Sequence, residues 1–251
     1  METFVMGDIH GAYKALLQCL ERSGFNYEED RLIQLGDVVD GFDEVYECVE
    51  ELLKIKDLIA IKGNHDDWFN EFIQTSYHPQ AWAQRGKSTA VSYMQHVGKK
   101  NLIIRSGEGY KTALSTADVP ATHQHFFLHQ CLYYIDNDNN CFVHAGFDRH
   151  TDFKEQQPFV YFWDRSLWSE ALSFNATARG EIKKVKFQMA TEFKNIFIGH
   201  TPTLNWMTDK PMQAANIYDI DTGAGHTGKL TIMNVRTKQY WQSDSVSELY
   251  K

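Results

Sequence analysis

Short apolar runs alternate with amphipathic stretches along the first third of the chain, and this alternation predicts its secondary structure. The apolar runs predict strands over Thr3–Met6, Arg31–Leu35 and Leu58–Ile61. Between them, apolar side chains recurring with helical spacing predict helices over Ala12–Arg22 and Asp43–Lys54. This β-α-β-α-β order predicts parallel strands joined by right-handed crossovers.

The rest of the chain divides into a helical middle and a strand-rich final part. Residues 66–130 are predicted to be mostly helical, with breaks at Tyr77-His78-Pro79 and Ser106-Gly107-Glu108-Gly109. A hairpin turn is expected at Asn137-Asp138-Asn139-Asn140, and strands are expected over 132–135, 141–144, 195–198, 217–220, 230–235 and 239–241. No linker divides the sequence, so we expect one domain over residues 1–251. Its expected fold is α/β, with two mixed β-sheets packed as a central sandwich flanked by helices.

Composition narrows the class of protein. Of the 251 residues, 43% are hydrophobic and 23% are charged, as in ordinary globular proteins. The net charge of −8 argues against nucleic acid or an anionic membrane as the main partner, because an acidic surface repels both. Cys19, Cys48, Cys131 and Cys141 have no metal-ligand spacing and are interpreted as small buried side chains in a reducing compartment. Neither a leader pattern nor a long apolar run occurs, so a cytoplasmic location is expected.

Each of the first three predicted strands is followed by a polar cluster bounded by glycine. The clusters are Gly7-Asp8-Ile9-His10-Gly11, Gly36-Asp37-Val38-Val39-Asp40-Gly41 and Gly63-Asn64-His65-Asp66. Because ligands collect at the carboxyl ends of strands in open parallel sheets, these loops should meet in one place. Their carboxylates, amide oxygen and imidazoles suit two adjacent divalent ions such as Mn²⁺, Fe²⁺ or Zn²⁺ better than calcium.

Two later strands each end in a histidine. His144 lies in Val143-His144-Ala145-Gly146, and His200 lies in Ile198-Gly199-His200-Thr201. A single histidine after a strand is more often structural than a ligand. Here the three acidic loops do not by themselves supply enough ligands for two metal ions, so a metal-binding role becomes the better interpretation. We therefore interpret both histidines as metal ligands.

Taken in order, these five strings resemble the calcineurin-like metallophosphoesterases. The similarity extends from residue 4 to about residue 225, and it is greatest to the phosphoprotein phosphatase branch, the serine/threonine phosphatases, especially its compact bacterial and phage enzymes. Further strings similar to that branch are Trp82 with Gln84-Arg85-Gly86 and Thr89, Phe162-Trp163-Asp164-Arg165, and Asp221-Thr222-Gly223.

The resemblance implies a set of metal ligands, which comprises Asp8, His10, Asp37, Asn64, His144 and His200. Asp8 and His10 would hold one ion, Asp37 would bridge both, and the others would complete the second site. The implied cofactor is therefore two divalent ions, with Mn²⁺ as the first choice and Fe or Zn as alternatives.

The resemblance also implies the residues that act on the substrate. His65, oriented by Asp40, would remain outside the metal sites as the acid, and Arg165 and Asn64 would bind the phosphate. The chemistry agrees, because two divalent cations less two carboxylates leave about two positive charges that attract a phosphate dianion. Ions roughly 3.5–4 Å apart can present a shared hydroxide in line with phosphorus.

The second loop departs from the family pattern. The family usually has Gly-Asp-x-Val-Asp-Arg-Gly there, and its arginine binds phosphate, whereas this chain has Gly41-Phe42 after Asp40. We interpret this as a subfamily variation in which another cation replaces the arginine, with Arg149 and Arg85 as candidates. The alternative is altered specificity or weakened activity.

The leading functional prediction is a dinuclear-metal phosphomonoesterase that uses in-line attack by a metal-bridging hydroxide on phosphoserine or phosphothreonine in proteins. The alternative is a dinucleoside polyphosphate hydrolase, like the diadenosine tetraphosphatases of the same branch. A non-catalytic phosphate-binding homologue is a third hypothesis, and the intact His65 and Asp40 argue against it. The expected partner is a phosphoprotein or a small phosphate ester, without nucleic acid or membrane, and the expected state is a monomer.

Other features have structural interpretations. The aromatic stretch Tyr161-Phe162-Trp163 is expected in the core rather than at the substrate. His123, His125 and His129 lie on a predicted helix after Pro120. The pair His125/His129, four positions apart, could bind metal, but without an HExxH arrangement we interpret it as surface or packing. No serine-nucleophile elbow, Walker loop or dinucleotide fingerprint supports a different chemistry.

Overall fold

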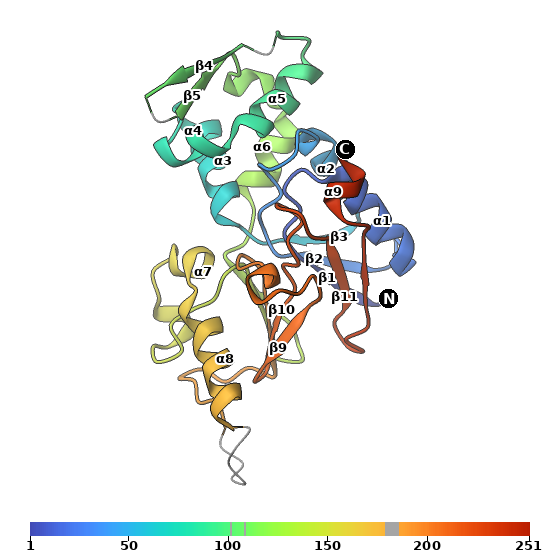
Figure 1. Cartoon of the computed structure of the whole chain (residues 1–251), viewed down its shortest axis with the longest axis vertical. Helices are drawn as coiled ribbons and strands as arrows, with labels where there is room; N and C mark the ends of the chain where they lie inside the picture. Colours follow the sequence, from blue (N-terminus) through green and yellow to red (C-terminus); the bar gives the residue numbers. More distant parts are fainter. Residues whose placement is uncertain (101, 108, 179–185) are drawn as a thin grey trace.

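Two five-stranded β-sheets form the centre of the computed structural model, which describes residues 1–100, 102–107, 109–178 and 186–251 (Figure 1). The first sheet has the order β12-β11-β1-β2-β3, with strands Thr3–Met6 (β1), Arg31–Gln34 (β2), Asp57–Ala60 (β3), Thr231–Asn234 (β11) and Tyr240–Gln242 (β12). The second has the order β6-β7-β8-β10-β9, with strands Tyr133–Ile135 (β6), Asn140–Val143 (β7), Asn195–Ile198 (β8), Met212–Ala214 (β9) and Ile217–Asp219 (β10). Both sheets contain parallel and antiparallel pairs.

Helices cover the outer faces of the two sheets. The helices whose buried side chains share one core cluster with the first sheet are Tyr13–Ser23 (α1), Val45–Leu52 (α2), Asn64–Thr75 (α3), Gln80–Arg85 (α4), Lys87–His96 (α5), Ala121–Leu128 (α6) and Val246–Leu249 (α9). The helices α3 to α6 lie at the top of Figure 1 with a small hairpin, Ile103–Ser106 (β4) and Gly109–Thr112 (β5). The second sheet is covered by Val160–Trp163 (α7) and Ser166–Ala178 (α8). Short 3-10 turns lie at Thr116–Asp118, Phe153–Glu155 and Thr203–Trp206.

Alternating side chains explain why the sheets pack face to face. Successive residues of a strand point to opposite faces, so Phe4 and Met6 of β1 contact the helices while Val5 points the other way. Val5 joins Phe142 and Phe197 of the second sheet in one core cluster. The rings of Phe142 and Phe197 stack with their centroids 4.9 Å apart. The layer between the sheets is therefore apolar and brings the ends of both sets of strands to one edge.

The fold class and the order of the elements confirm the prediction from the sequence. β1 and β8 have the predicted bounds, and the other predicted strands and the helices α1 and α2 differ from prediction by one or two residues at their ends. β1, β2 and β3 are parallel, as expected. The predicted turn before β7 contains Asn139 in the left-handed region, with φ of 62°.

Some elements differ from the prediction. The β4–β5 hairpin interrupts the helical middle. Among the described residues its strands pair only with each other and Ile104 is 56% exposed, so no alternating apolar pattern predicted these strands. Glu108, in the break predicted at residues 106–109, lies outside the described residues. The strand β9 and the helices α7 and α9 have only three or four residues, too few for periodicity to reveal.

The cysteines follow the prediction with one exception. Cys19, Cys48 and Cys141 are buried, whereas Cys131 is exposed. Cys131 is held by its backbone, which accepts a hydrogen bond from Lys62 and donates one to Ala60, so its side chain can face solvent. In the parts of the chain that the structure describes, the helices are too short or too polar to cross a membrane.

Candidate metal centre

The residues predicted to bind metal or act as the acid lie at the carboxyl ends of central strands. They are Asp8 and His10 after β1, Asp37 and Asp40 after β2, Asn64 and His65 after β3, His144 after β7, and His200 after β8. Because the two sheets pack together, loops from both converge at one edge, where open α/β sheets usually hold ligands. The structure therefore brings together residues that are up to 192 positions apart in the chain, as the hydrogen bond between Asp8 and His200 shows.

The backbone is strained at several of these positions. His10, Asp37, Asp40 and His200 have φ values of 52°, 54°, 67° and 68°, in the left-handed region that side chains other than glycine rarely adopt. Each such residue costs of order 1–3 kcal/mol, and strain of this kind gathers at functional sites, where the surrounding structure enforces it. The loops are thus shaped to aim their side chains inward at the expense of local stability.

One group of possible ligands consists of Asp8, His10 and Asp37. The ligand atoms of these side chains all lie within 4.8 Å of one another. The Nδ1 atom of His10 is 3.0 Å from the Val39 carbonyl and donates to it, so Nε2 remains available, 3.7 Å from Asp37 Oδ2. A backbone acceptor on one ring nitrogen is the usual way in which a metal-binding histidine is oriented.

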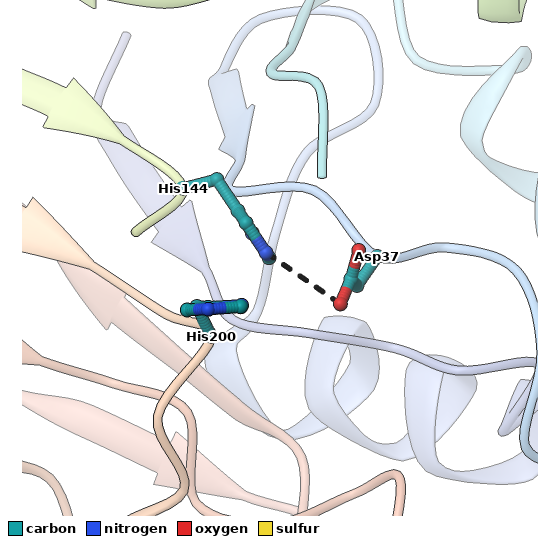
Figure 2. A group of neighbouring side chains, drawn as sticks. All are labelled: Asp37, His144 and His200. Atoms are coloured by element: carbon teal, nitrogen blue, oxygen red, sulfur yellow. Dashed lines mark ion pairs between the residues drawn. The ribbon is translucent and has the colours of Figure 1, made fainter. Parts of the chain in front are cut away.

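Asp37 also belongs to a second group, with His144 and His200 (Figure 2). His144 donates from Nδ1 to the Leu35 carbonyl at 2.7 Å, and its Nε2 lies 3.5 Å from Asp37 Oδ2 and 3.2 Å from the amide oxygen of Asn64. Because Nδ1 carries the proton of the neutral ring, Nε2 has a lone pair and no hydrogen. Three acceptor atoms, from His144, Asp37 and Asn64, therefore face one another. The buried Nε2 of His200 also has no hydrogen-bond partner among the described residues. Acceptors that converge in this way fit a cation between them.

The buried charges point in the same direction. Burial and then the charges of Asp221 and Asp37 raise the pKa of Asp8 well above its usual range. Burial, with the charge of Asp37, also raises the pKa of Asp221 to about 7. Carboxylates gathered in a buried site repel one another, and a bound cation removes this cost.

The histidines are in the form that binds metal. Burial lowers the pKa of His10 to about 4, and the nearby Asp37 carboxylate only partly opposes this. Burial and the neighbouring His144 lower the pKa of His200 to about 2. Both imidazoles are therefore neutral at pH 7, which is the protonation state of a metal ligand. Mixed carboxylate, amide and imidazole donors suit divalent ions of the first transition row.

His65 occupies a different environment beside the two groups. Its Nδ1 donates to Asp40 Oδ2 at 2.6 Å, and the Thr89 hydroxyl donates to Asp40 Oδ1 at 2.6 Å. Burial would lower the pKa of His65, but the carboxylates of Asp37, Asp40 and Asp66 outweigh it and raise the pKa to about 9. The pair is thus arranged to keep a proton on His65 at neutral pH, as the sequence predicts for the acid.

Asp66 holds the second and third loops together, a role that the sequence did not reveal. Its carboxylate accepts the backbone N–H groups of Asp37 at 2.8 Å, Val38 at 2.9 Å and Gly63 at 3.2 Å, and the Gln130 amide at 2.9 Å. An acidic residue at the third position of a helix was a signal for such capping. The same helix start presents Asn64 and His65 to the site.

Two glycines permit these close approaches. A Cβ atom at Gly63 would lie 2.0 Å from Asp37 Oδ1, and one at Gly199 would lie 2.1 Å from Asp8 Oδ1. Any side chain at either position would push a carboxylate out of its ligand group.

A cavity of about 550 Å³ opens onto the site. Of the predicted residues, it is lined by His10, Asp37, Asp40, Asn64, His65, Arg165 and His200. Arg165 is held beside the second ligand group, since its Nη1 donates to the Thr201 hydroxyl at 2.9 Å. The lining also includes residues for which no role was predicted, namely Trp68, Asn205, Asp221 and His226. They come from three segments, namely α3, the 3-10 turn Thr203–Trp206 and the loop between β10 and β11, so no local pattern marks them as a group.

Only one of the two arginines proposed to replace the one missing from the second loop lies at the site. Arg149 lies away from the site, where its guanidinium pairs with Glu170, donates to the Gln188 carbonyl at 2.8 Å and covers the Phe187 ring. Its place close to His144 in sequence was therefore misleading. Arg85, in contrast, lines the same cavity as His65.

The aromatic stretch after residue 160 is only partly in the core. Tyr161 and Phe162 are buried as predicted, but Trp163 is 41% exposed and lines the cavity. Its ring lies 5.4 Å from that of Trp68, which in turn lies 4.9 Å from His65. The prediction was wrong for Trp163, because α7 has a single turn and points its last residue towards the site.

The remaining histidines agree with their structural interpretation. His123 is buried and bonded to Tyr93 and Glu50. His125 and His129 are exposed, and their rings lie 3.8 Å apart at α6, outside the cavity.

Comparison with curated proteins gives relatives that match nearly the whole chain. Serine/threonine-protein phosphatase 1 of Salmonella typhimurium is 25% identical over 239 residues, which cover 93% of this chain and 91% of that protein. A symmetrical bis(5'-nucleosyl)-tetraphosphatase of Coxiella burnetii is 23% identical over 276 residues, which cover 96% of this chain and 92% of that protein.

Solved structures show the same fold at lower identity. A candidate diadenosine tetraphosphatase has a TM-score of 0.64 at 13% identity, covering 96% of this chain and 92% of its own. A cold-active protein-tyrosine phosphatase of Shewanella has a TM-score of 0.58 at 13% identity, covering 97% of this chain and 80% of its own. The model of the family described as calcineurin-like phosphoesterase matches residues 1–227, and the chain therefore belongs to this family of divalent-metal phosphoesterases.

Proposed function

We propose that the chain is a metal-dependent phosphomonoesterase that removes phosphate from phosphoserine or phosphothreonine in proteins. The observation that carries the proposal is that His65, bonded to Asp40, faces the same cavity as both ligand groups and Arg165. Two divalent ions held by these groups would neutralise phosphate charge and lower the pKa of water. We propose Mn²⁺ as the ion to test first, because the donors mix oxygen and nitrogen.

The chain's own residues have separable roles in this proposal. With Nδ1 of His65 bonded to Asp40, Nε2 is the atom left to give a proton to the leaving oxygen of the ester. Arg165, held by Thr201, would donate to the phosphate oxygens that gain charge as the ester bond breaks. A protein substrate is supported by the nearly full-length match to a serine/threonine-protein phosphatase.

A second candidate is the hydrolysis of dinucleoside polyphosphates. The observation that favours it is the pair Trp68 and Trp163 at the cavity, because aromatic rings that line a cavity can stack on a nucleobase. The relative from Coxiella burnetii is named for this type of activity.

A substrate panel separates the candidates. The purified protein, loaded with Mn²⁺, is expected to release phosphate from a phosphoserine or phosphothreonine peptide with a kcat/KM at least tenfold above that for diadenosine tetraphosphate. Turnover of the dinucleotide alone would overturn the proposal in favour of the second candidate. Binding of inorganic phosphate without hydrolysis of either substrate, or of an aryl phosphate, would show a non-catalytic homologue.

Arg165 and Arg149 are expected to respond differently to removal. Arg165→Ala should lower kcat/KM for 4-nitrophenyl phosphate by about 10²-fold, because one donor to the developing charge is lost. Arg149→Ala should stay within about twofold of the parent protein, because its guanidinium pairs with Glu170 outside the cavity. Steady-state kinetics at saturating metal measure both values, and an equal loss in the two variants would place Arg149 back at the substrate.

A further inference from the structure

Position 41 cannot supply the cation that the second loop lacks. Gly41 has φ of 79°, and a Cβ atom there would lie 2.7 Å from the carbonyl oxygen of His10 and 2.9 Å from its Cβ. An arginine at this position would therefore displace His10, a member of the first ligand group. A phosphate at this side of the cavity needs its positive partner from another segment.

We propose that Arg85 is this partner and that it binds the substrate phosphate opposite Arg165. The inference rests on the proposed function, since it concerns the same cavity. Arg85 is the last residue of α4, and it lines the cavity together with Gly41, His65 and Arg165. Arg85 and Gly41 also line a second, smaller depression, so both residues lie where the cavity and this depression adjoin.

The segment that carries Arg85 is tied to the catalytic pair. Thr89, four positions later, accepts the backbone N–H of Asp40 at 2.9 Å and donates to its carboxylate at 2.6 Å. Gly86 packs on the ring of the buried Trp82, which a Cβ atom at position 86 would approach to 2.1 Å. The position of Arg85 relative to Asp40 is thus set by packing on one side and by hydrogen bonds on the other.

Arg85 is exposed and lines the cavity. Within the described ranges its guanidinium forms no hydrogen bond or ion pair, whereas Arg149, Arg31 and Arg22 are paired with carboxylates. Arg85 also acts on His226 in the cavity wall, because burial lowers the pKa of His226 and the charges of Arg85 and then His65 lower it further. Arg85 therefore contributes its positive charge to the same part of the cavity as His226.

Two guanidinium groups would match a terminal phosphate. Arg165 is fixed beside His200, on the side of the second ligand group, and Arg85 lies beside Gly41, on the side of His10. Each can donate two hydrogen bonds to phosphate oxygens. A phosphate monoester dianion offers three such oxygens and one more negative charge than a diester, so this arrangement favours monoesters.

The test compares Arg85→Ala with Arg105→Ala in the metal-loaded full chain. Arg105 is exposed on β4, so its removal changes the net charge equally without touching the cavity. Calorimetry with inorganic phosphate is expected to show roughly 10–10²-fold weaker binding in Arg85→Ala and a change below about twofold in Arg105→Ala. Arg85→Lys should bind with intermediate affinity, because the charge remains while the two-pronged geometry is lost.

Hydrolysis gives a second readout. Arg85→Ala should lose more kcat/KM on 4-nitrophenyl phosphate than on bis(4-nitrophenyl) phosphate, and added guanidinium ion should restore part of the monoester activity. Phosphate affinity of Arg85→Ala equal to that of Arg105→Ala would overturn the proposal. If Arg85→Ala shows no cooperative thermal unfolding transition and is therefore not folded, Arg85→Gln replaces it in the comparison of phosphate affinity with Arg105→Ala.

The binding measurement separates this inference from the proposed function. If the protein hydrolyses no phosphate ester, the proposed function is refuted. The affinity of the variants for inorganic phosphate would still show whether Arg85 binds phosphate. Conversely, normal phosphate affinity in Arg85→Ala would remove Arg85 from the site while leaving phosphomonoesterase activity intact.

Discussion

Replacing His65 with asparagine is expected to slow hydrolysis of a phosphoserine peptide by roughly 10²–10⁴-fold while metal content stays unchanged. The Nδ1 atom of His65 is bonded to Asp40 and its ring lies beside the ligand groups without belonging to either. Asparagine can keep a hydrogen bond to Asp40 but cannot donate a proton to the leaving oxygen. The loss should therefore fall on kcat, with little change in phosphate affinity.

The leaving group provides an internal control for this experiment. An aryl phosphate leaves as a stable phenolate and needs less help from an acid, so the His65→Asn defect should be smaller on 4-nitrophenyl phosphate than on an alkyl ester. His125→Asn, at an exposed histidine of α6, should behave like the parent protein. Elemental analysis completes the test, because loss of metal in His65→Asn would make His65 a ligand and contradict its role as acid.

The first half of the site could be predicted from the sequence because its information is local. Each of β1, β2 and β3 is a short apolar run followed at once by its functional residues, so the strand and its ligands appear together. Parallel order then brings Asp8, Asp37 and Asn64 to one edge without further assumptions. The same reasoning extends to His144 and His200 once their strands are recognised in the second sheet.

The cavity wall could not be predicted, because it depends on contacts between segments that have no common pattern. The segment of Arg85 is joined to the second loop by the hydrogen bonds between Thr89 and Asp40, and its Gly86 packs on Trp82. Neither contact leaves a periodic pattern in the sequence. Arg149 shows the opposite case, since it is close to His144 in sequence but turns away to pair with Glu170. Tertiary partners decide which arginine lines the cavity.

Asp37→Asn is expected to have a larger effect on the metal centre than His65→Asn. Asp37 is the one residue shared by the two ligand groups found among the described residues. The amide of asparagine can still accept the His65 backbone N–H, which Asp37 Oδ1 accepts at 3.0 Å, so the loop should keep its shape. What is lost is the negative charge common to both groups. We expect metal content to fall well below that of the parent protein and kcat/KM to fall by about 10³-fold or more.

Asp67→Asn is the matched control, because this carboxylate lies on α3 and pairs with Lys62 at 3.2 Å, outside both ligand groups. Since a bound ion stabilises only the folded chain, added Mn²⁺ should raise the unfolding temperature of the parent protein and of Asp67→Asn. Asp37→Asn should show a much smaller rise. An unchanged rise, with unchanged metal content, would mean that Asp37 does not join the two groups, and the bridging role implied by the resemblance would be wrong. If Asp37→Asn shows no Mn²⁺-induced rise, yet its metal-free form unfolds at the same temperature as the metal-free parent, the loop has kept its structure. The shared negative charge, rather than the shape of the loop, is then what metal binding requires.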